Sequence, residues 1–221
     1  STPQSHYSFD VRNTFKVETG APSSLLWHGD SLLVFDSSGT PSQFSSGSGF
    51  CGTNKLVFPR YETSWSVGGS VVASALMKGK SPAVVVLAAN STTFGFFELS
   101  SVDSVAKSPK HASTIVSIAA SPNGIYLACG CINGALYVWE RSSGGAFTLV
   151  GDKGQLLHSD AVSSLCFSAD SSLVFSCGLD GSYFVYKVKE AGFLKPATNV
   201  MKLTENPPTD HQFTSFANEA E

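Results

Sequence analysis

The chain contains an internal repeat. HASTIVSIAASPNGIYLACGCINGALYVWE begins at His111 and HSDAVSSLCFSADSSLVFSCGLDGSYFVYK begins at His158, an offset of 47 residues that holds without gaps. The alignment superposes Asn133-Gly134 on Asp180-Gly181 and Trp139 on Tyr186. Periods of roughly 20–50 residues indicate solenoids, propellers or arrays, because each unit buries its apolar surface only against its neighbours. This repeat therefore restricts the fold to stacked, similar units.

Each unit has the pattern of short strands separated by turns. In the first unit, apolar runs at 114–119, 126–130 and 135–140 predict strands, with a turn at Ser121-Pro122-Asn123-Gly124. Asn133-Gly134 predicts a two-residue hairpin turn, because both residues tolerate the positive φ that such a turn requires. The 20 glycines and the 42% of hydrophobic residues favour many short strands around a sizeable core. The fold class predicted for the chain is therefore all-β.

The predicted strand at 126–130, together with the following Cys131, is apolar or small on both of its faces. Leu127, Cys129 and Cys131 share one side, and Tyr126, Ala128 and Gly130 share the other. A sheet with one solvated face would instead alternate between apolar and polar residues. The pattern predicts a sheet stacked between two others, as in the blade of a propeller.

Weaker strand patterns extend upstream of the repeat, at 24–27, 32–35, 43–44 and 55–58 and again at 70–77, 83–89, 93–99 and 102–105. About four blades are then visible, whereas a seven-bladed ring would need roughly 300 residues. The chain is a fragment, a ring of fewer blades, or a partial propeller completed by another chain. We expect an N-terminal strand that could close a blade at 1–20, degenerate blades at 21–60 and 61–108, repeat blades at 109–152 and 153–204, and an extended or disordered tail at 205–221.

The two units, from about Lys110 to Lys189, resemble WD repeats. In that family a His before the inner strand, a Ser or Thr on the second strand, an Asp in the following turn and a Trp on the third strand form a hydrogen-bonded network that pins the blade. Cys129 and Tyr186 depart from this pattern. The resemblance implies a WD-repeat-type β-propeller, with blade-pinning roles for His111, Cys129, Asn133 and Trp139 in the first unit and for His158, Ser176, Asp180 and Tyr186 in the second.

The cysteines do not predict a metal or redox site. The chain has five of them at irregular spacing, which indicates reduced intracellular thiols. Cys129 and Cys131 are separated by one residue, whereas zinc-binding pairs are usually separated by two to four, so we expect packing residues.

No enzymatic or cofactor-binding motif stands in a suitable context. Residues 47–52 formally match G-x-G-x-x-G, but a strand-like segment follows where a nucleotide site needs a helix, so we expect a surface loop. No catalytic, cofactor-binding or metal-binding residues are predicted.

Charge and hydropathy exclude several classes of partner. The net charge is −3 and no basic cluster is present, which disfavours nucleic acid. No apolar run reaches the length of a membrane span, and the first residues, STPQSHYSF, lack the features of a secretory signal. We expect a cytoplasmic or nuclear protein that does not bind membranes.

These observations favour a non-enzymatic protein-interaction scaffold, a WD-repeat propeller subunit of a multi-protein complex. Its partners would be other proteins, among them a chain that completes the propeller. Two alternatives stay open. One is a quinoprotein-type or other small-ligand-binding propeller, whose repeats have a similar strand pattern. The other is a protein component of a ribonucleoprotein assembly, which would require a basic rim.

Overall fold

The computed structural model describes residues 21–29, 31–37, 41–45, 70–99, 108–151, 153–188 and 200–202. The regular secondary structure in these ranges consists of β-strands, so the predicted all-β class is confirmed. Several expected features lie outside the described residues: the N-terminal strand at 1–20, the loop at 47–52, the strands at 55–58 and 102–105, and the tail at 205–221.

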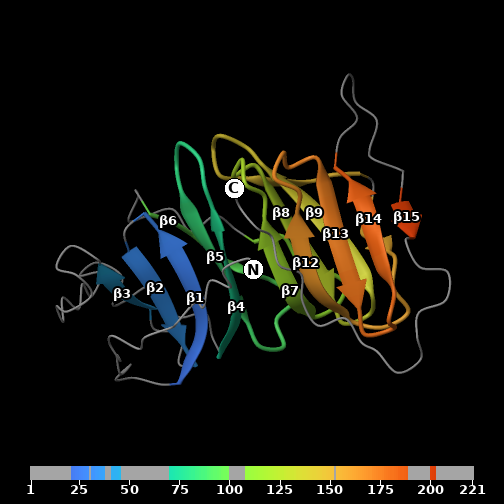
Figure 1. The fold of residues 1–221 in the computed structure, drawn as a ribbon, viewed down its shortest axis with the longest axis horizontal. Helices are drawn as coiled ribbons and strands as arrows, with labels where there is room; N and C mark the ends of the chain where they lie inside the picture. The colour runs from blue at the N-terminus through green and yellow to red at the C-terminus, as the bar shows by residue number, and fades with distance from the viewer. Residues whose placement is uncertain are drawn as a thin grey trace, which may run out of the picture.

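The strands form four antiparallel sheets, named blades 1 to 4 here, which follow one another from left to right in chain order (Figure 1). Blade 1 contains β1 (Pro22–His28), β2 (Ser31–Asp36) and β3 (Pro41–Ser45), and blade 2 contains β4 (Val71–Met77), β5 (Ala83–Ala88) and β6 (Gly95–Glu98). Blade 3 contains β7 (Ile115–Ala120), β8 (Tyr126–Cys131), β9 (Ala135–Arg141), β10 (Phe147–Leu149) and the short β11 (Gln155–Leu156). Blade 4 contains β12 (Val162–Phe167), β13 (Leu173–Gly178), β14 (Tyr183–Lys187) and β15 (Val200–Lys202).

The first strands of the four blades, β1, β4, β7 and β12, contact one another in that order. Hydroxyl groups join them directly. Ser24 Oγ lies 2.6 Å from Ser74 Oγ between blades 1 and 2, and Ser117 Oγ donates to the carbonyl of Val162 at 2.7 Å between blades 3 and 4. An arrangement in which each sheet contributes its first strand to a common inner layer is that of propeller blades.

All four first strands share one irregularity. The pairing register shifts between Pro22 and Ser24 in β1, and at the matching place near the start of the other three first strands, Val71/Ala73, Ile115/Ser117 and Val162/Ser164. β-Bulges bend a strand and are structural features in their own right. Blades 1 and 2 therefore have the blade geometry of the two repeat units, although their sequences show little of the repeat.

Apolar side chains on both faces of the middle strands of blades 2 and 3 hold the blades together. In β5, Val84 and Val86 pack toward blade 1, whereas Val85 and Leu87 pack toward blade 3. In β8, Leu127, Cys129 and Cys131 pack toward blade 2, whereas Tyr126 and Ala128 pack toward blade 4. The predicted two-sided burial is confirmed. Since full burial of one aliphatic side chain contributes about 1.5–3 kcal/mol, this stacking is the main stabilising feature of the fold.

The turn between β8 and β9 differs from the predicted two-residue hairpin. Three residues, 132–134, separate the strands, and Gly134 N–H donates to the carbonyl of Cys131 at 3.1 Å. Gly134 has a φ of 83°, but Asn133 does not have a positive φ. The prediction of a two-residue turn was wrong, because the same Asn-Gly pair also suits a type I turn followed by a left-handed glycine. Gly181 repeats this geometry in blade 4, with a φ of 73°.

Candidate functional site

His158 is the centre of a buried hydrogen-bond network in blade 4. Its Nε2 lies 2.9 Å from Ser176 Oγ, and its Nδ1 lies 3.2 Å from Asp180 Oδ1 and 3.0 Å from Ser182 Oγ. A carboxylate only accepts, so the bond to Asp180 requires a proton on Nδ1. The structure thus brings together three of the four predicted residues of this unit. Ser182, which follows the Asp-Gly turn, was not predicted.

Asp180 joins this network to the start of the blade. Its Oδ2 accepts the N–H of Ser159 at 2.8 Å, and its Oδ1 accepts the hydroxyl of Ser182 at 2.7 Å. Burial alone would raise the pKa of Asp180, but the hydrogen bonds from Ser159, Ser182 and His158 outweigh burial and hold the pKa well below its usual range. The carboxylate therefore stays charged as a fixed acceptor at the end of β13.

His111 has different partners in blade 3. Trp139 Nε1–H donates to His111 Nε2 at 3.0 Å, and since an indole nitrogen only donates, the proton of the imidazole is on Nδ1. Nδ1 then donates to the carbonyl of Thr92 in blade 2 at 3.1 Å. Burial lowers the pKa of His111, so the ring is neutral. This histidine connects two blades.

Neither of the other predicted residues of blade 3, Cys129 and Asn133, is hydrogen-bonded to His111. Asn133 is exposed, and its Oδ1 accepts the N–H of Ala135 within its own turn at 3.3 Å. Cys129 and Cys131 are fully buried in the core between blades 2 and 3. Burial raises the pKa of both thiols, to about 11 for Cys131, so both remain protonated at neutral pH. In blade 4, Tyr186 is buried in the apolar core facing blade 3.

Arg141, at the end of β9, connects blades 2 and 3 and was not singled out from the sequence. Its guanidinium donates to Glu98 at 2.5 Å and to the carbonyl of Ser81 at 2.7 Å, and it lies 4.7 Å from the centre of the Phe96 ring. An arginine at the end of a strand, outside any motif, does not indicate from sequence that it contacts a neighbouring blade. Its repeat partner, Val188, is apolar.

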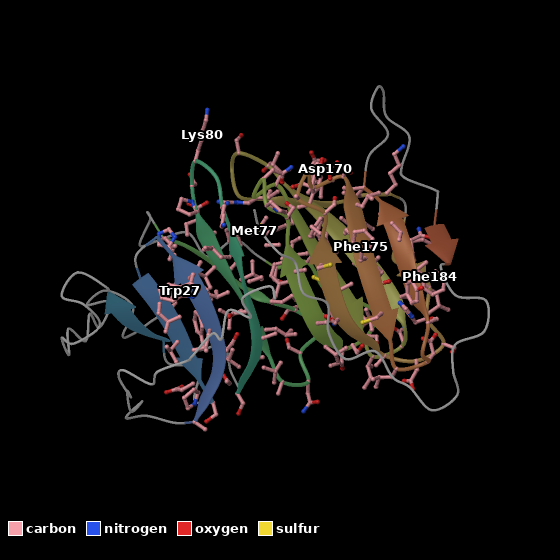
Figure 2. The ribbon with its side chains drawn as sticks, in the orientation of Figure 1. Trp27, Met77, Lys80, Asp170, Phe175 and Phe184 are labelled. Carbon is pink, nitrogen blue, oxygen red and sulfur yellow. The ribbon has the colours of Figure 1, made fainter. Side chains whose placement is uncertain are left out.

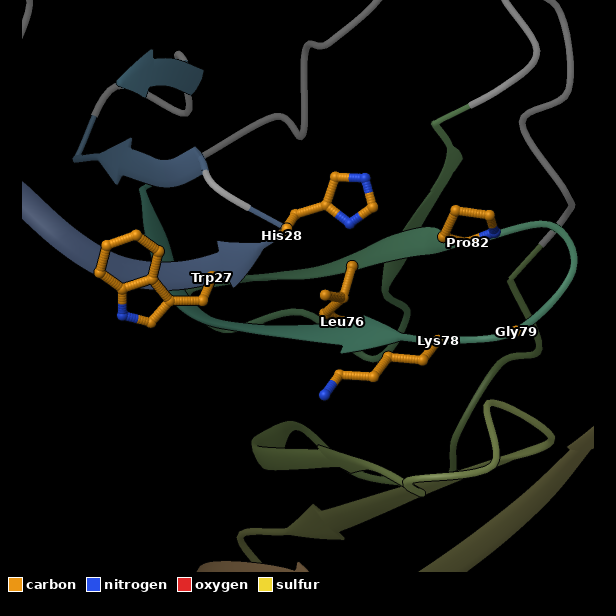
Figure 3. A pocket seen from close by; sticks show the side chains of 7 residues that line it. Trp27, His28, Leu76, Lys78, Gly79 and Pro82 are labelled. Atoms are coloured by element: carbon orange, nitrogen blue, oxygen red, sulfur yellow. The ribbon is translucent and has the colours of Figure 1, made fainter. Parts of the chain in front are cut away.

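The turns that join the first and second strands lie together at one end of the blades, which we call the first-turn rim. Figure 2 shows Lys80 of blade 2 and Asp170 of blade 4 at this end. Hydrogen bonds from the hydroxyls and the N–H of neighbouring serines hold the pKa of Asp170 at about 2. Between blades 1 and 2 the rim contains a groove of about 330 Å³ lined by Trp27, His28, Gly29, Leu76, Lys78 and Pro82 (Figure 3).

Within the described ranges, no three His, Cys, Asp or Glu side chains gather in a way that could hold a metal ion. In the same ranges no helix is long and apolar enough to cross a membrane.

Comparison with known proteins identifies the repeats. The family model described as "WD domain, G-beta repeat" matches residues 102–140 and 154–187. These ranges cover most of blades 3 and 4 and include the His158 network, together with His111 and Trp139. The resemblance proposed from the sequence is thereby confirmed.

Two curated fungal relatives are similar to part of the chain. "Protein hir1" of Schizosaccharomyces pombe is 34% identical over 89 residues, which cover 34% of this chain and 10% of the relative. "Protein HIR1" of Kluyveromyces lactis is 26% identical over 88 residues, which cover 35% of this chain and 10% of the relative. The matched region thus spans about a tenth of the length of either relative.

Proposed function

We propose that this WD-repeat chain is a non-enzymatic scaffold for protein interactions and one subunit of a multi-protein complex in the cytoplasm or nucleus. Stacked sheets support this function, because they hold the turns at both rims in fixed positions from which partners can be bound. The buried histidines fit a structural role better than a catalytic one. We propose that the His111 and His158 networks pin their blades.

The observation that carries this proposal is an apolar face of blade 1 that no other described blade covers. The strand pairing aligns Leu25 and Trp27 of blade 1 with Ile118 and Ala120 of blade 3. The blade 3 residues pack against blade 2, whereas Leu25 is 59% exposed and Trp27 is 57% exposed. Large apolar side chains at such exposure mark interaction surfaces when they are adjacent on one face.

We propose that a further propeller blade, supplied by a partner chain, covers this face of blade 1. The equivalent faces of blades 2 to 4 are each covered by the preceding blade. A partner with a sheet face of aliphatic and small residues would therefore fit blade 1 in the same way. The partner face should resemble the faces that blades 1, 2 and 3 present to the blade that follows each of them. On these faces Leu33, Val85 and Ala128 are buried.

Native co-purification tests the proposal. A tagged chain is expressed in its source cells, purified at physiological salt, and analysed by mass spectrometry and light scattering. We expect a defined complex with at least one protein in a fixed molar ratio. A monomer without stoichiometric partners, or one that turns over a small molecule, would contradict the scaffold function.

A further inference from the structure

We propose that the groove between the first turns of blades 1 and 2 binds a short acidic segment of a partner protein, with one apolar side chain inserted and carboxylates beside it. This inference rests on the proposed scaffold function and specifies the chemistry of one of its contacts. Three features of the described residues support it: a gap created by turn length, two apolar side chains in the lining, and cations at the edge.

The gap follows from the length of the first turn in each blade. In blade 1 only two residues separate the paired His28 and Ser31. Five residues separate Met77 from Ala83 in blade 2, and six separate Ala120 from Leu127 in blade 3. The turn of blade 1 is therefore too short to fill the space beside the longer turn of blade 2.

At the next junctions along the rim this space is filled. A Cβ atom placed on Gly124 of blade 3 would lie 1.3 Å from the carbonyl oxygen of Lys78, so these two turns are in backbone contact. The N–H of Asn123 donates to Ser171 Oγ of blade 4 at 3.1 Å. By contrast, a Cβ atom on Gly29 would meet nothing within 4 Å. The groove is thus specific to the junction of blades 1 and 2.

The lining of the groove is mixed: the side chains of Leu76 and Pro82 are apolar, and those of His28 and Lys78 are polar. In Figure 3, the side chains of His28 and Leu76 lie close together with Pro82 to their right, whereas the ring of Trp27 is directed away from them. The volume of about 330 Å³ is near the lower end of the range for ligand pockets, roughly 300–1,000 Å³. A space of this size, open to solvent, suits one side chain and its flanking backbone better than a folded domain.

The edge of the groove carries positive charge. Lys78 and Lys80 are exposed, and neither forms a salt bridge with the residues that the structure describes. The nearby carboxylate of Glu98 is already paired with Arg141. Asp30, which follows Gly29 in the sequence, lies outside the described residues. The apolar side chains of Leu76 and Pro82 and the lysines at the edge together match a peptide in which an apolar residue is next to Glu or Asp.

A peptide array with the purified chain as probe tests this chemistry. The array carries capped pentapeptides with Leu, Phe or Ala at the centre, flanked on both sides by Glu, Gln or Lys. We expect at least fivefold more binding to Leu or Phe peptides flanked by Glu than to the same centres flanked by Gln or Lys. Equal binding to the three flanks, or binding that is independent of the centre, would overturn the proposal.

A charge reversal identifies the site. Lys78→Glu should abolish the preference for Glu-flanked peptides and shift it toward Lys-flanked ones, because the edge of the groove changes sign. Lys153→Glu, on an exposed lysine of the segment between β10 and β11, makes the same change in net charge and should leave the preference intact. An equal effect of both variants, or no effect of Lys78→Glu, would place the binding elsewhere. If the array fails while a stoichiometric complex co-purifies, only the groove is disproved and the scaffold function stands.

Discussion

At the scale of single residues, the two buried histidines obtain equivalent hydrogen bonds from different side chains. The Nε2 of His111 accepts from the indole of Trp139, whereas the Nε2 of His158 is paired with the hydroxyl of Ser176. Blade 3 has Cys129 at the position of that serine, and blade 4 has Tyr186 at the position of that tryptophan. Blade 3 therefore has the Trp of the family pattern but not the Ser, whereas blade 4 has the Ser but not the Trp.

This exchange predicts a rescue. Trp139→Phe keeps the aromatic packing but leaves His111 Nε2 without a donor, which should lower the free energy of unfolding by about 1–3 kcal/mol. Adding Cys129→Ser to that variant places a hydroxyl where blade 4 has Ser176, and should recover at least half of the loss. Urea denaturation of the two single variants and the double variant measures this. Purely additive effects would show that the two positions do not serve the same histidine.

A second prediction concerns pH. Burial lowers the pKa of His111 in the folded chain, so the unfolded chain, with a histidine pKa of about 6.5, binds more protons below that pH. The contribution of His111 is therefore fully present above pH 6.5 and is lost as pH falls toward the folded pKa. The loss is at most about 1.4 kcal/mol for each pH unit.

His111→Gln removes the titrating group and tests this sign. We compare the free energy of unfolding at pH 7.5 and pH 5.5 for the wild type and the variant. The decrease on acidification should be smaller in the variant. If both proteins lose the same free energy, His111 does not have the lowered pKa.

At the scale of elements, the strands could be predicted because their signal is local. Apolar runs bounded by Gly, Pro, Asn and Ser placed β5, β8 and β9 within one residue of their ends, even where the repeat was weak. The turn at Asn133-Gly134 was predicted wrongly because its length depends on how the two strands pair. No shared sequence pattern marks the bulge in each first strand. The residues at which the bulges begin have different neighbours in the sequence: Pro22, Val71, Ile115 and Val162.

Contact between neighbouring first turns predicts a strict requirement for glycine at position 124. Gly124 has a φ of 72°, and a Cβ atom there would lie 1.3 Å from the Lys78 carbonyl oxygen. Gly124→Ala should therefore destabilise the chain by more than about 1 kcal/mol, because backbone atoms of blade 2 would have to move. Thermal or urea unfolding measures the change.

Gly144→Ala is the matched control. Gly144 does not have a positive φ, and the nearest atom to its added Cβ, Ser142 Oγ, is 3.9 Å away. We expect its free energy of unfolding to stay within about 1 kcal/mol of the wild type. A Gly124→Ala variant as stable as this control would mean that the turns of blades 2 and 3 are not in contact.

At the scale of the whole molecule, stability comes from blades that cover each other in chain order. The two-sided apolar pattern of a single strand predicted this stacking, because each face requires a neighbour. The groove could not be predicted in the same way. It depends on a difference between two turn lengths in blades that share little sequence, and on Leu76 and Pro82 meeting His28 across a blade junction.

Because each face requires a neighbour, substitutions on the exposed face of blade 1 can test whether a partner chain covers it. Leu25 aligns with Ile118 of blade 3 and Leu165 of blade 4, which pack against preceding blades, yet Leu25 is 59% exposed. Leu25→Lys should therefore change the free energy of unfolding by less than about 0.5 kcal/mol, as expected for an exposed side chain. In the complex, however, the lysine would be buried without a partner, which is strongly unfavourable.

We expect Leu25→Lys to weaken partner binding at least tenfold, equivalent to about 1.4 kcal/mol, in a titration of the purified chain with its co-purified partner. Leu156→Lys is the control, since Leu156 is 71% exposed on β11 of blade 3. Both substitutions add one charge to an exposed leucine, so general effects of charge and solubility cancel. Equal binding of the two variants would show that blade 1 is not covered in the complex, and the partner would then bind at the rims alone.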